Sequence, residues 1–74
     1  MNIAELKEKL KAERVSPALY NLDMKGRDDE RLNIVFEDGK WVVYYLERGM
    51  RTTEEKYDTE DEACRCILRK FRLL

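Results

Sequence analysis

The sequence predicts an α+β domain in the order α-β-β-β-α, a three-stranded antiparallel meander with two helices packed on one face. Three local signals support this fold class. Asp38-Gly39 separates two runs rich in β-branched and aromatic residues, which is typical of a two-residue hairpin turn. Residues 2–14 carry apolar side chains at helical spacing. Thr59 and Glu62 form a T-x-x-E helix start.

Length and composition predict one small domain, residues 1–74. The chain is 43% hydrophobic and 42% charged, which is enough apolar content for a core and argues against disorder. Its 15 basic and 16 acidic residues leave a net charge of −1, so the chain as a whole does not attract nucleic acid or anionic lipid. The sequence contains neither a long apolar run nor the apolar core of a signal peptide. We therefore expect a cytoplasmic protein without membrane contact.

The segment before the hairpin is expected to be helical at first and then irregular. Residues 2–14 form the first helix, with an Asn-x-x-Glu capping box at its start. Ser16-Pro17 suits the start of a single helical turn over residues 18–22. Residues 23–31 are expected to form a polar loop that contains the acidic run Asp28-Asp29-Glu30.

The Asp38-Gly39 turn sets the register of the first hairpin, with Glu37 opposite Lys40 and Phe36 opposite Trp41. Because side chains alternate along a strand, one face should pack under the helices. This predicted core face carries Leu32, Ile34, Phe36, Trp41, Val43 and Tyr45. The opposite, open face carries Asn33, Val35, Glu37, Lys40, Val42, Tyr44 and Leu46. Phe36 and Trp41 are predicted core anchors, and replacing either by alanine should cost about 3 to 5 kcal/mol.

The second turn leaves the register of the last strand open. A strict Arg48-Gly49 loop would point Lys56 into the core, whereas one extra loop residue points Thr53, Glu55 and Tyr57 inward. We expect the longer, bulged loop, because it buries an aromatic ring rather than a lysine. The strand that follows is polar and charged, which suits the edge of the sheet.

The last helix should fill the core with an apolar stripe. The stripe consists of Ala63, Cys64, Ile67, Leu68, Phe71 and Leu74. Cys64 and Cys66 point about 200° apart on this helix, so a bond between them is not expected. Cys64 lies early in the helix, where a thiol pKa can fall, but its place on the stripe favours packing. The sequence has no histidine and no third cysteine, so we expect no metal site, no cofactor and no enzyme activity.

The element order is also that of the double-stranded RNA-binding domain. In that family, basic residues at the start of the last helix hold phosphates. Here the same position reads Thr59-Glu60-Asp61-Glu62, and three carboxylates would repel a phosphate backbone. The later cations are expected to form a solvated helix face that complements the helix dipole. These cations are Arg65, Arg69, Lys70 and Arg72. Nucleic acid is therefore not the expected partner.

The open face of the sheet has two interpretations that the sequence leaves open. Its apolar side chains Val35, Val42, Tyr44 and Leu46 can be scattered residues under long polar neighbours. They can also form a patch that binds a protein. The rim of such a patch would be Glu37, Lys40, Glu47 and Glu54.

Two motifs resemble a known family. Residues 41–49 are similar to a W-x-V-Y-Y-x-E-R-G pattern, and residues 57–64 to an aromatic residue followed by D-[ST]-E-D-E-A-C. Both patterns recur in small bacterial immunity-type proteins of polymorphic toxin systems. Pro17-x-x-Tyr20-x-Leu22 also fits, whereas Leu46 stands where a small polar residue is usual.

The resemblance implies a non-catalytic protein that neutralises a cognate toxin by stoichiometric binding. Candidate partner-binding residues are Val42, Tyr44, Glu47, Arg48, Glu54, Asp28, Asp29 and Glu30. The carboxylates would suit a basic nuclease toxin. If the open face is the interface, Tyr44→Ala should leave folding nearly intact and weaken partner binding at least tenfold, about 1.4 kcal/mol. The alternative class is a regulatory or homo-oligomeric module, with a homodimer through the same face.

Overall fold

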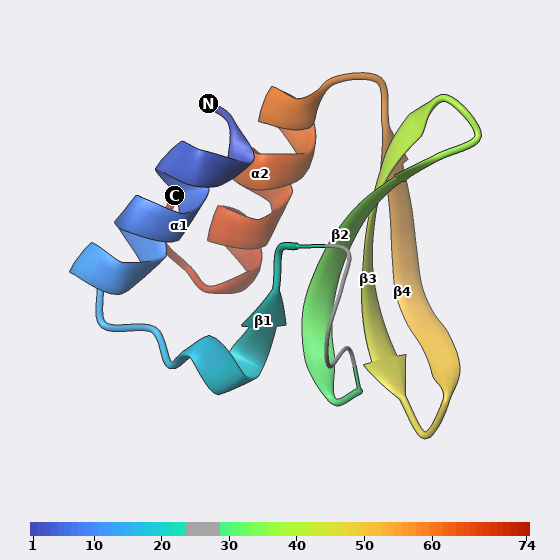
Figure 1. Cartoon of the computed structure of the whole chain (residues 1–74), viewed down its shortest axis with the longest axis horizontal. Coiled ribbons are helices and arrows are strands. Elements are labelled where there is room, and N and C mark those ends of the chain that lie inside the picture. Colours follow the sequence, from blue (N-terminus) through green and yellow to red (C-terminus); the bar gives the residue numbers. More distant parts are fainter. Residues whose placement is uncertain (24–28) are drawn as a thin grey trace.

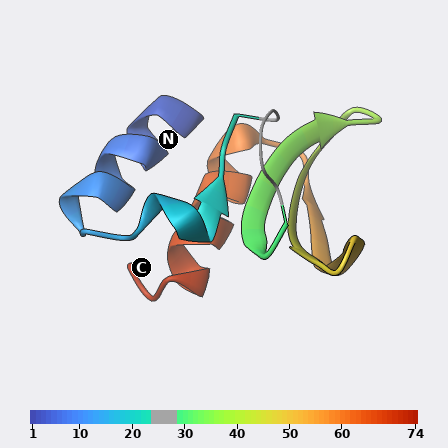
Figure 2. The ribbon, with the colours of Figure 1, turned by 60° about the horizontal axis from the view of Figure 1, so that its bottom comes forward.

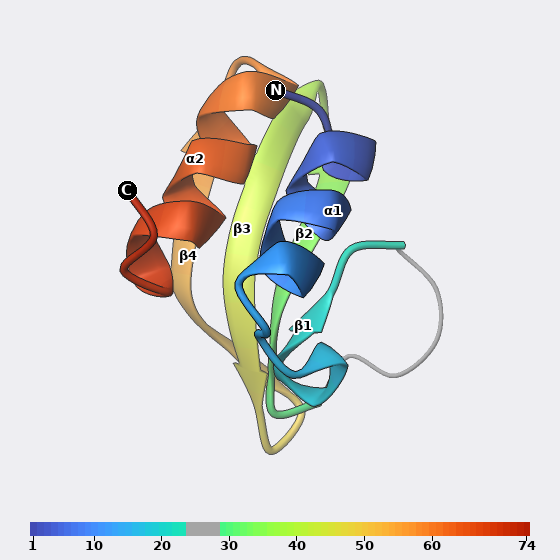
Figure 3. The ribbon, with the colours of Figure 1, turned by 90° about the vertical axis from the view of Figure 1, so that its left-hand side faces the viewer.

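The computed structural model describes residues 1–23 and 29–74, in which two helices cover one face of a mixed sheet (Figure 1). The elements are α1 (Ile3–Ala12), the 3₁₀ turn η1 (Pro17–Leu19), β1 (Tyr20–Asn21), β2 (Arg31–Glu37), β3 (Lys40–Glu47), β4 (Met50–Tyr57) and α2 (Glu60–Lys70). The strands lie in the order β1-β2-β3-β4. Figures 2 and 3 show α1 and α2 side by side on the same side of the sheet. The predicted α+β class is confirmed.

A short strand, β1, adds a parallel pair to the predicted antiparallel meander. Tyr20 lies opposite Leu32 in β2, although the sequence predicted a helical turn over residues 18–22. The helical turn stops one residue before Tyr20, whose backbone is extended (φ −145°, ψ 157°). This conformation brings the Tyr20 ring edge-on to Phe71, with ring centroids 6.4 Å apart. Packing of one aromatic ring and the ladder with β2 therefore override the local helical signal.

The first hairpin has the predicted register. Glu37 lies opposite Lys40, and Phe36 lies opposite Trp41. Asp38 and Gly39 have φ values of 50° and 75°, the left-handed backbone that a type I′ turn requires. A two-residue turn leaves no freedom to slip, so local turn chemistry alone determines this pairing.

The second hairpin contains the predicted extra residue, but in the strand rather than in the loop. Glu47 pairs with Met50, so the loop is the tight Arg48-Gly49 turn that the sequence analysis rejected. The register shifts by one residue further along β4, where Thr53 has a φ of 49°. Beyond this bulge Tyr57 lies opposite Trp41, as predicted. The bulge allows a tight turn and an inward-facing Tyr57 at once.

The core lies between the helices and the sheet, and α2 packs against β3 and β4. Its buried cluster comprises Leu6, Leu10, Tyr20, Leu22, Ile34, Val43, Ala63, Cys64, Cys66, Ile67 and Leu68. Phe36 is 50% exposed, so its prediction as a core anchor is wrong, whereas Trp41 packs against the cluster. Leu74 is also exposed, and Leu73 packs in its place.

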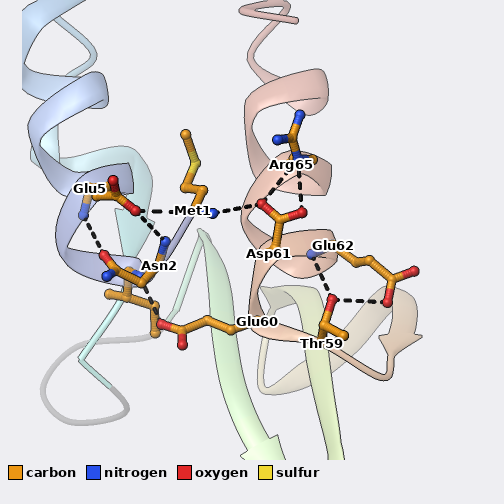
Figure 4. A network of polar contacts seen from close by, with 9 residues as sticks. Met1, Asn2, Glu5, Thr59, Glu60, Asp61, Glu62 and Arg65 are labelled. Atoms are coloured by element: carbon orange, nitrogen blue, oxygen red, sulfur yellow. Dashed lines mark hydrogen bonds and ion pairs between the residues drawn. The ribbon is translucent and has the colours of Figure 1, made fainter.

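The two helices begin side by side and share their capping groups (Figure 4). Asn2 and Glu5 form the predicted capping box of α1. A carboxylate of α2, Glu60, accepts the backbone N–H of Ile3 at 2.8 Å. Asp61 accepts the amino group of Met1 at 2.8 Å and also pairs with Arg65. Acidic residues that the sequence placed only at the start of α2 thus also hold the start of α1.

Candidate interaction surfaces

The outer face of the sheet, which is turned away from the helices, is closed at its centre. Val42 is 0% exposed and Tyr44 5% exposed. The prediction that these two side chains form an open patch is therefore wrong. The Arg51 guanidinium lies over the Tyr44 ring, 4.1 Å from its centroid. A long cationic side chain from the edge strand thus covers apolar surface that the sequence pattern assigned to solvent.

Arg51 holds this face closed through two carboxylates. It pairs with Glu37 from β2 and with Glu54 at 3.2 Å. Arg51 is paired with Leu46 of β3, whereas Glu37 is paired with Lys40. These two positions of β3 are six residues apart. In a flat sheet they would be about 20 Å apart, so this face curves inward. The Arg51 hydrogen bond holds the pKa of Glu37 below its ordinary value. Glu54, predicted to bind a partner, is thus engaged within the chain.

Four of the predicted partner-binding residues meet at the β3–β4 turn. Asp29 forms an isolated bridge with Leu46, and the next backbone N–H, that of Glu30, donates to the Leu46 carbonyl at 2.7 Å. These bonds place the two carboxylates beside Glu47 and Arg48. We define the turn surface as Asp29, Glu30, Glu47, Arg48, Gly49 and Met50. Two segments that are distant in sequence therefore form one end of the sheet.

Hydrogen bonds within the chain hold the turn surface in place, and the residues at its tip are exposed. The carboxylate of Glu30 accepts the Arg48 backbone N–H at 3.4 Å and the Tyr45 hydroxyl at 3.3 Å. Met50 is 71% exposed, and Glu47 and Arg48 are exposed. Its three carboxylates outnumber its one guanidinium, with Arg31 and Arg51 beside it opposite Leu46. Such a surface can bind a cationic partner and add an apolar contact through Met50. Asp28, the eighth predicted residue, lies outside the described residues.

An aromatic pair with one exposed ring, which the sequence pattern assigned to the core, lies at the opposite end of the sheet. Phe36 lies against Trp41, with ring centroids 5.0 Å apart and planes tilted by 52°. Half of the Phe36 side chain is exposed. The alternating pattern indicated its face correctly but could not indicate how far the helices extend over that face. The cover above a strand depends on tertiary packing, for which the sequence carries no local signal.

A polar cluster joins β4 to α2 around the carboxylate of Glu55. It accepts the Tyr57 hydroxyl at 2.7 Å, the Cys66 thiol at 3.1 Å and the Lys70 ammonium at 3.1 Å. These three donors lower the pKa of Glu55 to about 2. Burial raises the pKa of Tyr57 and of Cys66 above their ordinary values. The cluster therefore keeps a carboxylate charged beside protonated donors, which suits a fixed contact between elements.

Neither cysteine has the environment of a reactive thiol. Both are free and buried, and burial raises the pKa of Cys64 to about 11. The helix start does not lower it, because Glu60 and Asp61 raise it further. Within residues 1–23 and 29–74, no group of three or more Cys, Asp or Glu side chains could hold a metal ion.

No family model, curated protein or solved structure matches this chain. The resemblance to immunity-type proteins therefore depends on the two sequence motifs alone. In the part of the chain that the structure describes, neither helix is long and apolar enough to cross a membrane.

Proposed function

We propose that this is a non-catalytic binding protein of the immunity type, which neutralises a cognate bacterial toxin by stoichiometric occlusion. The observation that carries the proposal is the turn surface. It brings the Glu47-Arg48-Gly49 part of the family-like motif together with Asp29 and Glu30. In this view the motif serves two purposes, because Arg48 and Gly49 form the turn and Glu47 faces the partner.

Charge and order of the turn surface support a basic protein as partner. Its carboxylates would steer a cationic protein toward the turn and raise the association rate at low salt. Met50 adds an exposed apolar side chain to this surface, which a partner could bury. Because Glu30 already holds the turn, little conformational entropy is lost on binding. A nuclease toxin with a positive substrate-binding surface would fit this description.

The second candidate is a homo-oligomeric module that buries Met50 between copies. The 71% exposure of this side chain favours it. The carboxylates around Met50 oppose it, because two identical acidic surfaces repel each other. Sedimentation velocity over a range of protein concentrations distinguishes the two, since only the second candidate predicts concentration-dependent dimers.

Affinity capture from the native host, followed by binding measurements with the purified partner, tests the proposal. Glu47→Lys reverses an exposed charge on the turn surface, and Glu8→Lys makes the same change on the exposed side of α1. We expect Glu47→Lys to weaken binding at least tenfold, about 1.4 kcal/mol, mainly through a slower association at low salt. Glu8→Lys should bind like the wild type. Failure to capture a discrete protein, or equal binding by both variants, would refute the proposal.

A further inference from the structure

The Phe36–Trp41 pair belongs to a row of aromatic side chains whose cover by α2 decreases along the row. Phe36, Trp41 and Tyr57 lie opposite one another on β2, β3 and β4. Because α2 packs against β3 and β4, Trp41 and Tyr57 are half-buried, whereas Phe36 is 50% exposed. An aromatic ring left in this position costs solubility and adds little to the core.

The exposed ring is held in place rather than mobile on the surface. Its stacking on Trp41, at 5.0 Å, restricts its orientation. The hairpin that carries both rings has the rigid Asp38-Gly39 turn. Lys40 pairs with Asp58, which ties this hairpin to the segment before α2. A pre-organised aromatic side chain loses little entropy on binding, so it is suited to anchor a partner.

The end of the molecule that carries this pair has a small excess of carboxylates over cations. Figure 1 places the β2–β3 turn and the start of α2 at the same end of the molecule. These segments carry Glu37, Asp38, Asp58, Glu60, Asp61 and Glu62 against Lys40. Arg51, Lys56, Arg65 and the Met1 amino group offset most of this charge. An apolar centre with a carboxylate rim is complementary to a basic protein surface that has an apolar recess.

We propose that Phe36, supported by Trp41, is the apolar anchor of a second contact surface for the same basic protein partner. This inference rests on the proposed function. The β2–β3 turn and the turn surface lie at opposite ends of the eight-residue strand β3, at most about 26 Å apart. A partner domain of ordinary size is wide enough to contact both ends. A second copy of this chain is disfavoured as occupant, because its own carboxylate rim would face this one.

Phe36→Ser and Leu19→Ser form a matched pair that tests the anchor. Both remove a large apolar side chain that is half exposed, 50% for Phe36 and 49% for Leu19. Leu19 lies in η1, away from the aromatic row. The probe is the purified protein that the wild-type chain captures from the native host. We expect Phe36→Ser to weaken its binding at least tenfold and Leu19→Ser to leave it unchanged, with a cooperative thermal transition in each variant confirming that both fold.

Trp41 supplies an independent readout, because it is the only tryptophan of the chain. If the partner covers Phe36, binding should shift the Trp41 emission and reduce its quenching by acrylamide. A partner without tryptophan, or one labelled with a tryptophan analogue, makes this signal specific. Emission and quenching that do not change at saturation would overturn the inference.

The outcomes separate this inference from the proposed function. If the captured partner binds Phe36→Ser as tightly as the wild type but binds Glu47→Lys weakly, the Phe36 anchor is ruled out and the proposed function is supported. If the partner loses affinity only for Phe36→Ser, the contact lies at the aromatic end and the turn surface is ruled out as the binding surface. Absence of any captured partner refutes both.

Discussion

At the scale of single residues, Glu55 shows how one polar side chain holds two elements together. It lies on the edge strand, yet it points toward α2 because the bulge at Thr53 changes the alternation of β4. Its three donors come from both sides, Tyr57 from the strand and Cys66 and Lys70 from the helix. This accounts for a cysteine at a position that the apolar stripe did not require: Cys66 is 2% exposed and fills space while its thiol donates to a carboxylate.

The first prediction concerns the pH dependence of stability. Because the folded state lowers the pKa of Glu55 from its ordinary value of 4.5 to about 2, its charge stabilises the fold above pH 4.5. This stabilisation is lost as the pH falls from 4.5 toward 2. Glu55→Gln should lower the thermal midpoint at pH 6, and between pH 6 and pH 3 its midpoint should fall less than that of the wild type. Parallel decreases in the two proteins would contradict the assignment.

The second prediction reverses the stability order expected from the sequence. Tyr44 is buried under Arg51, so Tyr44→Ala should lower the free energy of unfolding by about 3 to 5 kcal/mol. Phe36 buries about half of its surface, so Phe36→Ala should cost only about 1 kcal/mol. Urea melts of the two variants measure both values. A larger loss for Phe36→Ala than for Tyr44→Ala would contradict the burial described above.

At the scale of elements, the chain uses left-handed backbone at positions that carry side chains. Arg14 and Arg72, with φ values of 58° and 60°, follow α1 and α2 in the same way. In each case the next residue, Val15 or Leu73, donates its N–H to a carbonyl five residues earlier and packs on the core. Both helices therefore end in the same Schellman arrangement, with arginine where glycine is usual.

The third prediction is a stabilising substitution in β4. Thr53 is β-branched and has a φ of 49°, a conformation that costs an L-residue about 1 to 2 kcal/mol. Thr53→Gly should therefore raise the free energy of unfolding by about 1 kcal/mol. Thr52→Gly is the control, because Thr52 lies in the same strand but has no positive φ. This substitution should lower the free energy of unfolding. Equal destabilisation of the two variants, measured by urea melts, would show that the bulge is not strained.

At the scale of the whole molecule, the two helices are joined at their starts by carboxylates of α2. Parallel helices place like dipole ends together, which is unfavourable by itself. Glu60 and Asp61 offset this, because one caps Ile3 and the other accepts the Met1 amino group. Hydrogen bonds from the Met1 amino group and from Arg65 lower the pKa of Asp61. Acidic residues that would repel a phosphate backbone thus have a structural role in this fold.

The fourth prediction tests this connection. Glu60→Ala should expose the backbone N–H of Ile3 and loosen α1 by about 1 kcal/mol, the usual cost of losing a helix cap. Hydrogen exchange of the α1 amides should then be about five times faster, whereas the amides of α2 should change less. Glu8→Ala, on the exposed side of α1, is the control. Uniform acceleration over both helices would mean that Glu60 acts on global stability.

Part of the candidate site could be predicted from the sequence, because the residues of that part are neighbours in the chain. Glu47, Arg48 and Gly49 follow one another, and their turn depends on backbone conformations that glycine at the second position favours. Asp29 and Glu30 could be named as carboxylates but not placed, because their position depends on the bond to Leu46. The Phe36 surface could not be predicted, because its exposure is set by where α2 lies on the sheet.

The sequence by itself determined the features that depend on neighbours in the chain. These are the register at Asp38-Gly39, the capping box of α1, the Thr59 N-cap of α2 and the α+β order. The α2 capping box predicted from Thr59 and Glu62 is only half formed, because the Glu62 carboxylate accepts the Thr59 hydroxyl rather than the Thr59 backbone N–H. Only the tertiary structure decided which apolar side chains are buried, since Arg51 closes the outer face over Tyr44 while Phe36 stays open. The physical reason is range: turns and caps are settled by hydrogen bonds within a few residues, whereas burial depends on elements that meet from distant parts of the chain.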